Sequence, residues 1–517
     1  MDLFQGILHG FSIALVPTKL FACFAGVLVG TAVGVLPGIG PSGSIALLLP
    51  LTFSMDTTSA IIMLAGIYYG TMYGGSTTSI LVNVPGEAQS VVTCLDGYQM
   101  ARQGRAGPAL GISAFGSFIA GTIGVIGLMV IAPPLARFAL EFGPAEIFGL
   151  VLLAFALVGY LASGSMTKAL MMSVLGLLLA SVGMESITAV PRFTFGSVNL
   201  QSGINLVPLI MGLFGVSEVL LSLEESSSEG KLNARRHQPK FWDLFPNRKD
   251  WRNSFWPITR GSLLGFIIGL LPGGTGIVAS FSSYGIEKKI SRHPERFGKG
   301  AIEGVAGPES ANNGAAQGAF IPLLTLGIPG NASMALTLGA LRIHGVIPGP
   351  LLIQEHPQVF WGVVASMYIG NFLLLILNLP LIGIWVRLLS IPTSVLYSMI
   401  ILFCTIGAYG VNNSVFDIGV LFFFGFLGYV LKSLNFELAP LILGFILGPV
   451  METSAKQALI MSGGHFSIFF STRISTLLLV LTFLVIVTAV YSGIKHGKMS
   501  RTMEALKREM DASKEKD

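Results

Sequence analysis

Charge is scarce in this chain. Only 11% of its 517 residues are Asp, Glu, Lys or Arg, whereas 52% are hydrophobic, and the mean hydropathy is +0.75. Soluble domains carry about 25% charged residues, so the composition excludes an ordinary soluble protein and indicates a polytopic membrane protein. The net charge of +5 is spread over loops and the C-terminal tail. In a membrane protein such charge reports orientation, and we expect no nucleic acid partner.

Cysteines and metal-binding motifs are also lacking. The three cysteines, Cys23, Cys94 and Cys404, lie far apart, which excludes a disulfide framework and any CxxC or Cys/His spacing for zinc. The sequence has no HExxH motif and no GxGD-like aspartate in an apolar run. Residues 1–10 contain no Lys or Arg, so the basic region of a cleavable signal peptide is missing. We expect no bound organic cofactor.

What stands out against this apolar background is a polar stretch at residues 301–334, AIEGVAGPESANNGAAQGAFIPLLTLGIPGNASM. In hydrocarbon each free backbone N–H or C=O costs several kcal/mol, so irregular backbone survives only inside protein or beside a watery cavity. We therefore interpret residues 301–334 as helix-breaking sequence at a transport site. An ordinary surface loop over residues 303–313 is the alternative.

The first half of the chain contains two comparable breaks. Residues 36–44, LPGIGPSGS, interrupt an apolar run, because Pro lacks the N–H that a helix needs and Gly is unfavourable inside helices. The apolar run that follows, residues 45–53, is too short to span a membrane alone. Residues 74–87, GGSTTSILVNVPGE, follow the apolar run 60–73. Discontinuous helices of this kind are typical of substrate sites in transporters.

The composition changes abruptly at residues 224–257, which are rich in charged residues, Ser and Asn. We interpret this segment as a cytoplasmic linker. The predicted organisation is a first membrane repeat at residues 1–223, the linker at 224–257, a second repeat at 258–473, and an extra helix with a basic cytoplasmic tail at 474–517.

The two halves repeat each other. Leu36-Pro37-Gly38 recurs as Leu271-Pro272-Gly273, 235 residues later, and Pro85-Gly86 recurs as Pro329-Gly330, 244 residues later. A repeated, ordered pair of breaks is a stronger signal than either match alone.

Loop charges predict how the repeats are related. Residues 54–59 contain no basic residue, whereas the corresponding loop, residues 286–300, carries five. Because basic short loops stay in the cytoplasm, equivalent loops face opposite sides, as an inverted-topology repeat requires. We predict an all-α polytopic membrane protein with an outward N-terminus, about 12 transmembrane helices, broken or re-entrant helical hairpins and two inverted repeats.

Three motifs resemble a known family, the TctA-type large membrane subunit of the tripartite tricarboxylate transporters. They are residues 34–41 (GVLPGIGP), residues 73–87 (YGGSTTSILVNVPGE), and residues 307–313 (GPESANN) with 327–330 (GIPG). The resemblance covers nearly the whole chain. It implies import of citrate-like carboxylates by ion-coupled secondary transport in the bacterial inner membrane. It also implies a small four-helix TctB-type membrane subunit and a periplasmic TctC-type solute-binding protein as partners.

The breaks suit a carboxylate, because helix N-termini carry partial positive charge and free N–H groups. The motifs contain no Lys or Arg, so dipoles and neutral donors must hold the anion. Arg342 follows the last break, although snorkelling to the interface is an equal alternative. The predicted substrate-binding residues are Gly38, Gly40, Ser42, Ser44, Ser76, Thr77, Thr78, Asn83, Pro85, Gly86, Gly273, Gly274, Thr275, Asn312, Asn313, Pro329, Gly330 and Asn331.

For the coupling ion the sequence favours sodium over protons. Hard cations take oxygen ligands from carbonyls, hydroxyls and amides, and the breaks supply them. The predicted coupling-ion residues, which are also the possible Na⁺ ligands, are Gly75, Ser79, Thr275, Glu309, Ser310, Asn312 and Asn313. Proton coupling stays open, since Glu87 and Glu309 are ionisable residues in or beside the motifs.

Two other functions compete with a carrier. An intramembrane hydrolase would use Ser42 as nucleophile with His465 as base, but nothing in the sequence brings these residues together. An ion channel would conduct without solute. A carrier with an elevator-type movement of the hairpins remains the favoured interpretation, by analogy with other hairpin-bearing carriers.

Overall fold

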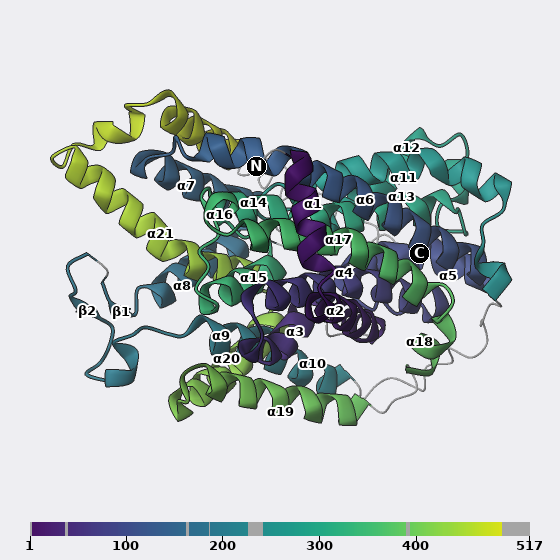
Figure 1. The fold of residues 1–517 in the computed structure, drawn as a ribbon, viewed down its shortest axis with the longest axis horizontal. Coiled ribbons are helices and arrows are strands. Elements are labelled where there is room, and N and C mark those ends of the chain that lie inside the picture. Colours follow the sequence, from purple (N-terminus) through teal and green to yellow (C-terminus); the bar gives the residue numbers. More distant parts are fainter. Residues whose placement is uncertain are drawn as a thin grey trace, which may run out of the picture.

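The computed structural model describes residues 3–36, 40–161, 165–185, 187–225, 241–388 and 393–488. These residues are almost entirely helical (Figure 1). Six of the described helices are long and apolar enough to cross a membrane, and five shorter apolar helices accompany them. The all-α polytopic class is confirmed, whereas the count of about 12 spans stays a prediction.

The first half begins with α1 and places the two predicted breaks between α2 and α3 and between α4 and α5. Its helices are α1 (Leu3–Ala14), α2 (Pro17–Val35), α3 (Gly40–Leu48), η1 (Leu49–Ser54), α4 (Thr57–Val82), η2 (Ala88–Ser90), α5 (Val91–Arg102), α6 (Ala106–Ala139), α7 (Pro144–Leu161), α8 (Met166–Ala180), η3 (Val198–Leu200), α9 (Leu206–Ile210), the π-helical η4 (Met211–Val216) and α10 (Ser217–Glu225).

The second half follows the linker. Its helices are η6 (Phe241–Leu244), α11 (Arg248–Gly269), α12 (Gly276–Ile290), η7 (Pro294–Arg296), α13 (Glu303–Gly318), α14 (Phe320–Leu326), α15 (Ala332–Ile343), α16 (Leu352–Glu355), α17 (Pro357–Asn378), α18 (Ile382–Leu388), α19 (Thr393–Asn412), α20 (Val415–Ser433), α21 (Ala439–Met461), η8 (Phe466–Phe470) and the helix Arg473–Thr488. The predicted linker, residues 224–257, lies partly outside the described residues, and α11 begins inside it at Arg248.

Glycines repeat with the same spacing in the two halves and fix two matching helix pairs. A Cβ at Gly26, Gly30 or Gly34 of α2 would lie 2.4–2.6 Å from a carbonyl oxygen of α4. A Cβ at Gly261, Gly265 or Gly269 of α11, each 235 residues later, would lie 2.0–2.3 Å from a carbonyl oxygen of α13. Small residues let helix backbones touch in this way. Each pair is therefore packed backbone to backbone.

Equivalent helices of the two halves run antiparallel. Tyr68 of α4 stacks edge-on against Phe320 at 5.9 Å between ring centroids, whereas Ser76, further along α4, contacts Glu309, which lies earlier in the second half. In the same way Phe118 and Met129 of α6 meet α17 in reversed order, at Asn371 and Tyr368. This arrangement agrees with inverted repeats, because a parallel repeat would align the helices in one direction.

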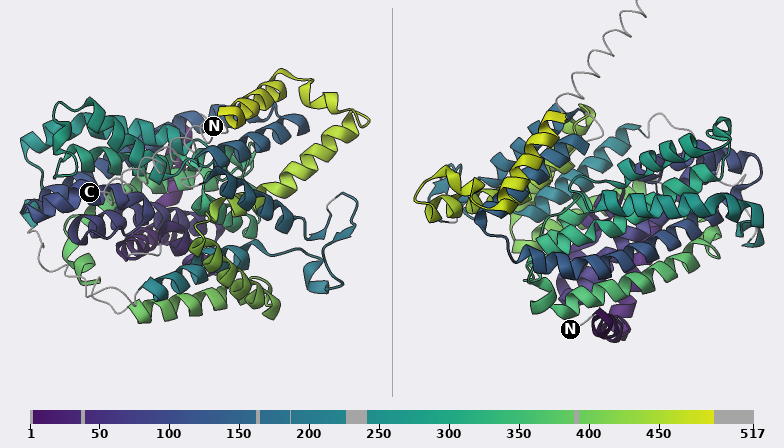
Figure 2. Two further views of the ribbon diagram at one scale, coloured as in Figure 1. Left: turned by 180° about the vertical axis from the view of Figure 1, so that it is seen from behind. Right: turned by 90° about the horizontal axis from the view of Figure 1, so that it is seen from above.

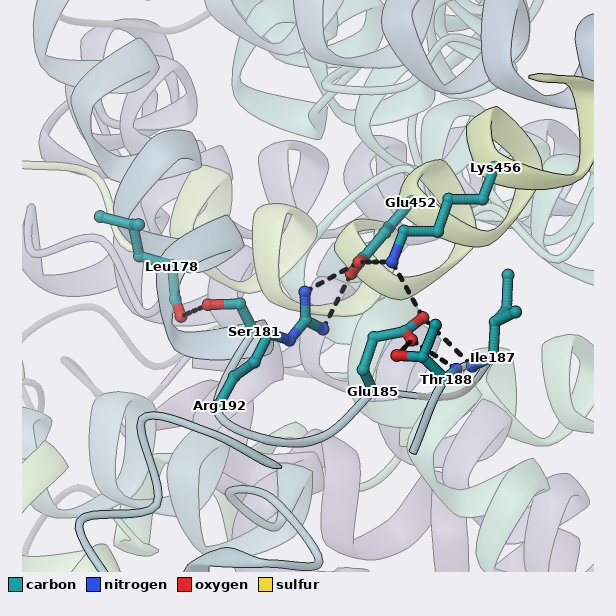
Figure 3. A network of polar contacts seen from close by, with 8 residues as sticks. All are labelled: Leu178, Ser181, Glu185, Ile187, Thr188, Arg192, Glu452 and Lys456. Atoms are coloured by element: carbon teal, nitrogen blue, oxygen red, sulfur yellow. Dashed lines mark hydrogen bonds and ion pairs between the residues drawn. The ribbon is translucent and has the colours of Figure 1, made fainter. Parts of the chain in front are cut away.

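Two peripheral features mark opposite ends of the molecule. The short strands β1 (Gly183–Met184) and β2 (Pro191–Arg192) form a hairpin that projects at one end together with the turn after α21, whereas α5, α12 and the start of α13 lie at the other (Figures 1 and 2). Ion pairs connect the hairpin to α21: Arg192 makes two hydrogen bonds to Glu452, at 2.8 and 3.0 Å, and Lys456 bridges Glu452 and Glu185 (Figure 3).

Two sequence interpretations were wrong. Residues 303–318 are not irregular backbone but the helix α13, and residues 74–79 lie inside the continuous helix α4. Both segments are buried against other helices, and their Gly residues serve helix contact rather than chain breaking. The actual breaks in these regions are shorter. They begin at Asn83 and at Gly327, which both adopt the left-handed conformation that ends a helix.

Candidate functional site

Two short breaks, each lined by polar groups, form the candidate site. We call residues 83–90 the first tip and residues 327–334 the second tip. At the first tip α4 ends at Asn83, with φ of 60°, and at the second α14 ends at Gly327, with φ of 69°. After a Pro-Gly pair, Glu87 and Asn331 occupy equivalent N-cap positions, of η2 and α15. All these equivalent residues are separated by 244 positions.

Each tip contacts the long helix of the other half in an equivalent way. Asn312 of α13 donates a hydrogen bond from Nδ2 to Oε1 of Glu87 at 2.9 Å. At the second tip, Asn331 donates from Nδ2 to Oη of Tyr68, on α4, at 3.1 Å. Tyr68 and Asn312 are themselves 244 residues apart. The pair of contacts is therefore repeated by the internal symmetry of the chain.

The N-terminus of a short helix faces each tip. At the first tip, a Cβ on Gly276 of α12 would lie only 1.7 Å from Oε1 of Gln89 and 2.4 Å from Oδ1 of Asn312. At the second tip, the hydroxyls of Ser42 on α3 and Ser333 lie 3.1 Å apart, and the backbone N–H of Gly273 donates to the carbonyl of Gly330 at 2.8 Å. The paired hydroxyls and the helix N-terminus at the second tip suit an anion.

A second buried acid lies near the first tip but differs from Glu87 in its surroundings. Glu309 is 1% exposed, and its two carboxylate oxygens accept hydrogen bonds from Ser76, at 2.5 Å, and from Thr93. These donors come from α4 and α5, so Glu309 joins the two halves. Asn313 donates to Ser117 of α6 at 2.7 Å and to the Glu309 carbonyl at 3.1 Å.

Other predicted residues have local roles. Ser44 and Ser79 donate to the carbonyls of Gly40 and Gly75 in their own helices, which is the usual behaviour of hydroxyls in apolar helices. Thr78 donates to the carbonyl of Val35 at 2.5 Å. Thr275 caps α12 by accepting from Val278 at 3.5 Å.

The remaining predicted residues fall into three groups. Thr77 is buried, and the Ser310 hydroxyl is buried without a hydrogen-bond partner among the described residues. Arg342 is exposed in the last turn of α15. Gly38 lies outside the described residues.

Four polar residues at the two tips or beside them escaped the sequence interpretation. Tyr68, Gln89, Thr93 and Ser333 lie in or next to apolar or featureless stretches. The repeat itself carries the signal for one of them, because moving the predicted Asn312 back by 244 positions gives Tyr68. Gln89 and Ser333 are also 244 positions apart, but neither of them was predicted. Thr93 is recognisable only from its contact with Glu309.

A family model described as the tripartite tricarboxylate transporter TctA family matches residues 20–443. The chain belongs to the TctA family. The matched range contains both tips, Glu309 and the helices that carry them. The resemblance inferred from the sequence motifs is thereby confirmed, and the chain is a component of a membrane transporter.

Two relatives from Agrobacterium vitis are similar to this TctA-family chain. One, described as an uncharacterized 52.8 kDa protein in the TAR-I ttuC' 3'region, is 50% identical over 495 residues, which cover 96% of this chain and 98% of the relative. The other, an uncharacterized protein in the TAR-II ttuC' 3'region, is 51% identical over 231 residues, 45% of this chain and 96% of the relative. No solved structure matches the chain.

Proposed function

We propose that this chain is the permease subunit of a binding-protein-dependent secondary transporter that imports tricarboxylates or related carboxylates, driven by an ion gradient, with sodium favoured. One observation carries the proposal: the two broken hairpins meet long helices of opposite halves through equivalent contacts, Asn312 with Glu87 and Asn331 with Tyr68. Discontinuous helices that face each other across inverted repeats are where secondary transporters bind their solutes.

The second tip has the chemistry of an anion site. Of the paired hydroxyls of Ser42 and Ser333, one proton makes their mutual hydrogen bond and the other is free for a ligand. Tyr68 Oη accepts a hydrogen bond from Asn331, and its own proton has no acceptor among the described residues. Together with the N-terminus of α3 these neutral donors favour a carboxylate. They also release it more readily than a buried Arg would, because no ion pair must be broken.

The movement that we propose is of the elevator type. Helices α2–α5 and α11–α15 form the transport unit, and the remaining helices form the scaffold. The backbone contacts between α2 and α4, and between α11 and α13, support this division, since closely packed pairs move as bodies. Crosslinks between unit and scaffold that form equally with and without substrate would argue against it.

The remaining proposals follow from the family. A tripartite system implies a small TctB-type membrane subunit and a periplasmic TctC-type solute-binding protein, and we propose the bacterial inner membrane as the location. An enzyme receives no support from the site: the hydrogen-bond partner of Ser42 Oγ among the described residues is another hydroxyl, Ser333, rather than a general base.

Uptake into vesicles tests the proposal. Right-side-out vesicles that contain this chain with its two partner subunits should accumulate a radiolabelled di- or tricarboxylate when an inward sodium gradient is imposed at fixed pH. Omitting the binding protein should abolish uptake. Accumulation that follows only a pH gradient would move the coupling to protons, and solute-independent ion flux would identify a channel.

A further inference from the structure

We propose that the first tip is a sodium site whose ligands are Glu87, Gln89 and Asn312, an assignment that rests on the proposed transport function. Neither Glu87 nor Gln89 belongs to the coupling-ion set that the motifs predict. The site lies between the halves of the chain, because Glu87 and Gln89 belong to the first repeat and Asn312 belongs to the second.

Two buried oxygen atoms at this place have no hydrogen-bond partner. Oε2 of Glu87 and Oδ1 of Asn312 are both unpartnered among the described residues, although the two side chains are only 3% and 1% exposed. A buried polar atom without a partner is destabilising. An oxygen that carries negative charge is the more costly case, unless a cation compensates it.

One of the two unpartnered atoms, Asn312 Oδ1, lies close to a third oxygen, Oε1 of Gln89. The hydrogen bond from Asn312 Nδ2 to Glu87 Oε1 leaves Asn312 Oδ1 as the free amide atom. This Oδ1 and Oε1 of Gln89 both lie within 2.4 Å of the Cβ position of Gly276. Only a glycine lets these oxygens approach the backbone of α12 so closely. A carboxylate and two amide oxygens are ligands that hard cations prefer, and a single carboxylate balances one monovalent charge.

The neighbouring acid does not offer the same ligands. Both oxygens of Glu309 already accept hydrogen bonds from Ser76 and Thr93, so Glu309 has no oxygen without a hydrogen-bond partner. Among the described residues, no Lys, Arg or His forms an ion pair with Glu87. Apart from the partial positive charge of the α12 N-terminus, a bound sodium ion would supply the positive charge that an ionised Glu87 needs.

The second tip shows what the first tip would look like without a cation. Asn331 replaces Glu87, and its two amide atoms are used, because Oδ1 caps α15 at Met334 and Nδ2 donates to Tyr68. Ser333 replaces Gln89 and contacts Ser42. The same frame thus holds neutral donors at one tip and free oxygens at the other.

The test measures sodium binding apart from transport. The full-length chain is reconstituted in nanodiscs, and its melting temperature is followed as NaCl replaces choline chloride at constant ionic strength. A ligand that binds only the folded state raises the melting temperature. We expect a saturable rise for the wild type, no rise for Glu87→Gln, and for Gln89→Leu a midpoint sodium concentration about tenfold higher.

Tyr68→Phe is the matched control, because Tyr68 holds at the second tip the place that Asn312 holds at the first. It should keep the wild-type sodium midpoint. Gln89 is only half-buried, so Gln89→Leu keeps the test meaningful if Glu87→Gln fails to fold. The proposed sodium site would be wrong if the melting temperature of the wild type did not change with sodium. It would also be wrong if the wild type and Gln89→Leu had equal sodium midpoints. Carboxylate uptake driven by a pH gradient would then still support the transport function, whereas sodium binding without any carboxylate uptake would defeat the transport function alone.

Discussion

The two tips have one backbone plan and two chemistries. Each contains, in order, a left-handed residue, a Pro-Gly pair and an N-cap, and each contacts the long helix of the opposite half. At the first tip the cap is Glu87, with free oxygens around Gly276, and at the second it is Asn331, with hydroxyl and amide donors. The repeat therefore supplies the geometry, and we propose that single substitutions within it decide which sign of charge each tip binds.

We expect the largest effect from a substitution that makes the second tip resemble the first. Asn331→Asp keeps the N-cap oxygen but places a negative charge where a carboxylate should bind. Because like charges in a low-dielectric site repel strongly, we expect the KM for carboxylate uptake to rise about a hundredfold, with the sodium midpoint unchanged.

Asn331→Ser is the control for this change, since Ser also caps helices but adds no charge. Its KM should rise much less. Equal kinetic effects of the Asp and Ser variants would show that the charge is irrelevant and that the carboxylate binds elsewhere.

A smaller effect is expected from removing the space that Glu87 needs. A Cβ at Gly75 would lie 2.5 Å from Cγ of Glu87, so Gly75→Ala should displace this carboxylate and raise the sodium midpoint about tenfold. Overpacking of this kind costs about 1–3 kcal/mol of stability.

The equivalent position in the second half is Ala319, which provides the matched control. Ala319→Gly should cost about 1 kcal/mol through helix propensity and leave the sodium midpoint unchanged. Nanodisc melting curves over a sodium series measure both quantities. If Gly75→Ala kept the wild-type midpoint, the position of Glu87 would not matter for sodium.

Removing the Tyr68 hydroxyl tests the second tip alone. Tyr68→Phe deletes the acceptor of the Asn331 amide and a donor for the ligand, so the KM for the carboxylate should rise about three- to tenfold. Tyr69→Phe is the control: the Tyr69 hydroxyl contacts the Ser366 carbonyl at 3.5 Å, away from both tips. Initial uptake rates over a concentration series distinguish the two variants, and equal KM values would remove Tyr68 from the site.

We expect the smallest effect from substitutions in the peripheral hairpin formed by β1 and β2. Hydrogen bonds from Thr188 and Ile187, with the Lys456 ammonium, lower the pKa of Glu185 to about 2. Since this folded-state pKa lies below the ordinary value of 4.5, the stability that Glu185 contributes to the folded state is complete above pH 4.5 and is lost as the pH falls toward 2.

The ion pair between Arg192 and Glu452 holds the same hairpin against α21. Arg192→Ala should lower the melting temperature by about 1–2 °C and leave uptake unchanged. A large loss of uptake would assign the hairpin a role in transport.

The sequence was informative where chain chemistry is local. Pro-Gly pairs and the spacing of 244 residues located both tips, and the loop charges predicted inverted repeats. It misled where burial overrides propensity, because the Gly- and Asn-rich residues 303–318 are helical once α11 packs against their small side chains. The contacts between halves could not be predicted, since no local pattern tells that Tyr68 meets Asn331 or that Thr93 meets Glu309.

One crosslinking measurement tests most directly whether a tip forms the transport site. The hydroxyls of Ser42 and Ser333 lie 3.1 Å apart, so Ser42→Cys and Ser333→Cys are combined in one variant. The native Cys23, Cys94 and Cys404 are replaced in this variant so that only the new pair can form a disulfide. Oxidation should form a disulfide that abolishes carboxylate uptake, reduction should restore it, and the carboxylate should slow the crosslinking. Complete crosslinking with undiminished uptake and no protection by the carboxylate would contradict the account.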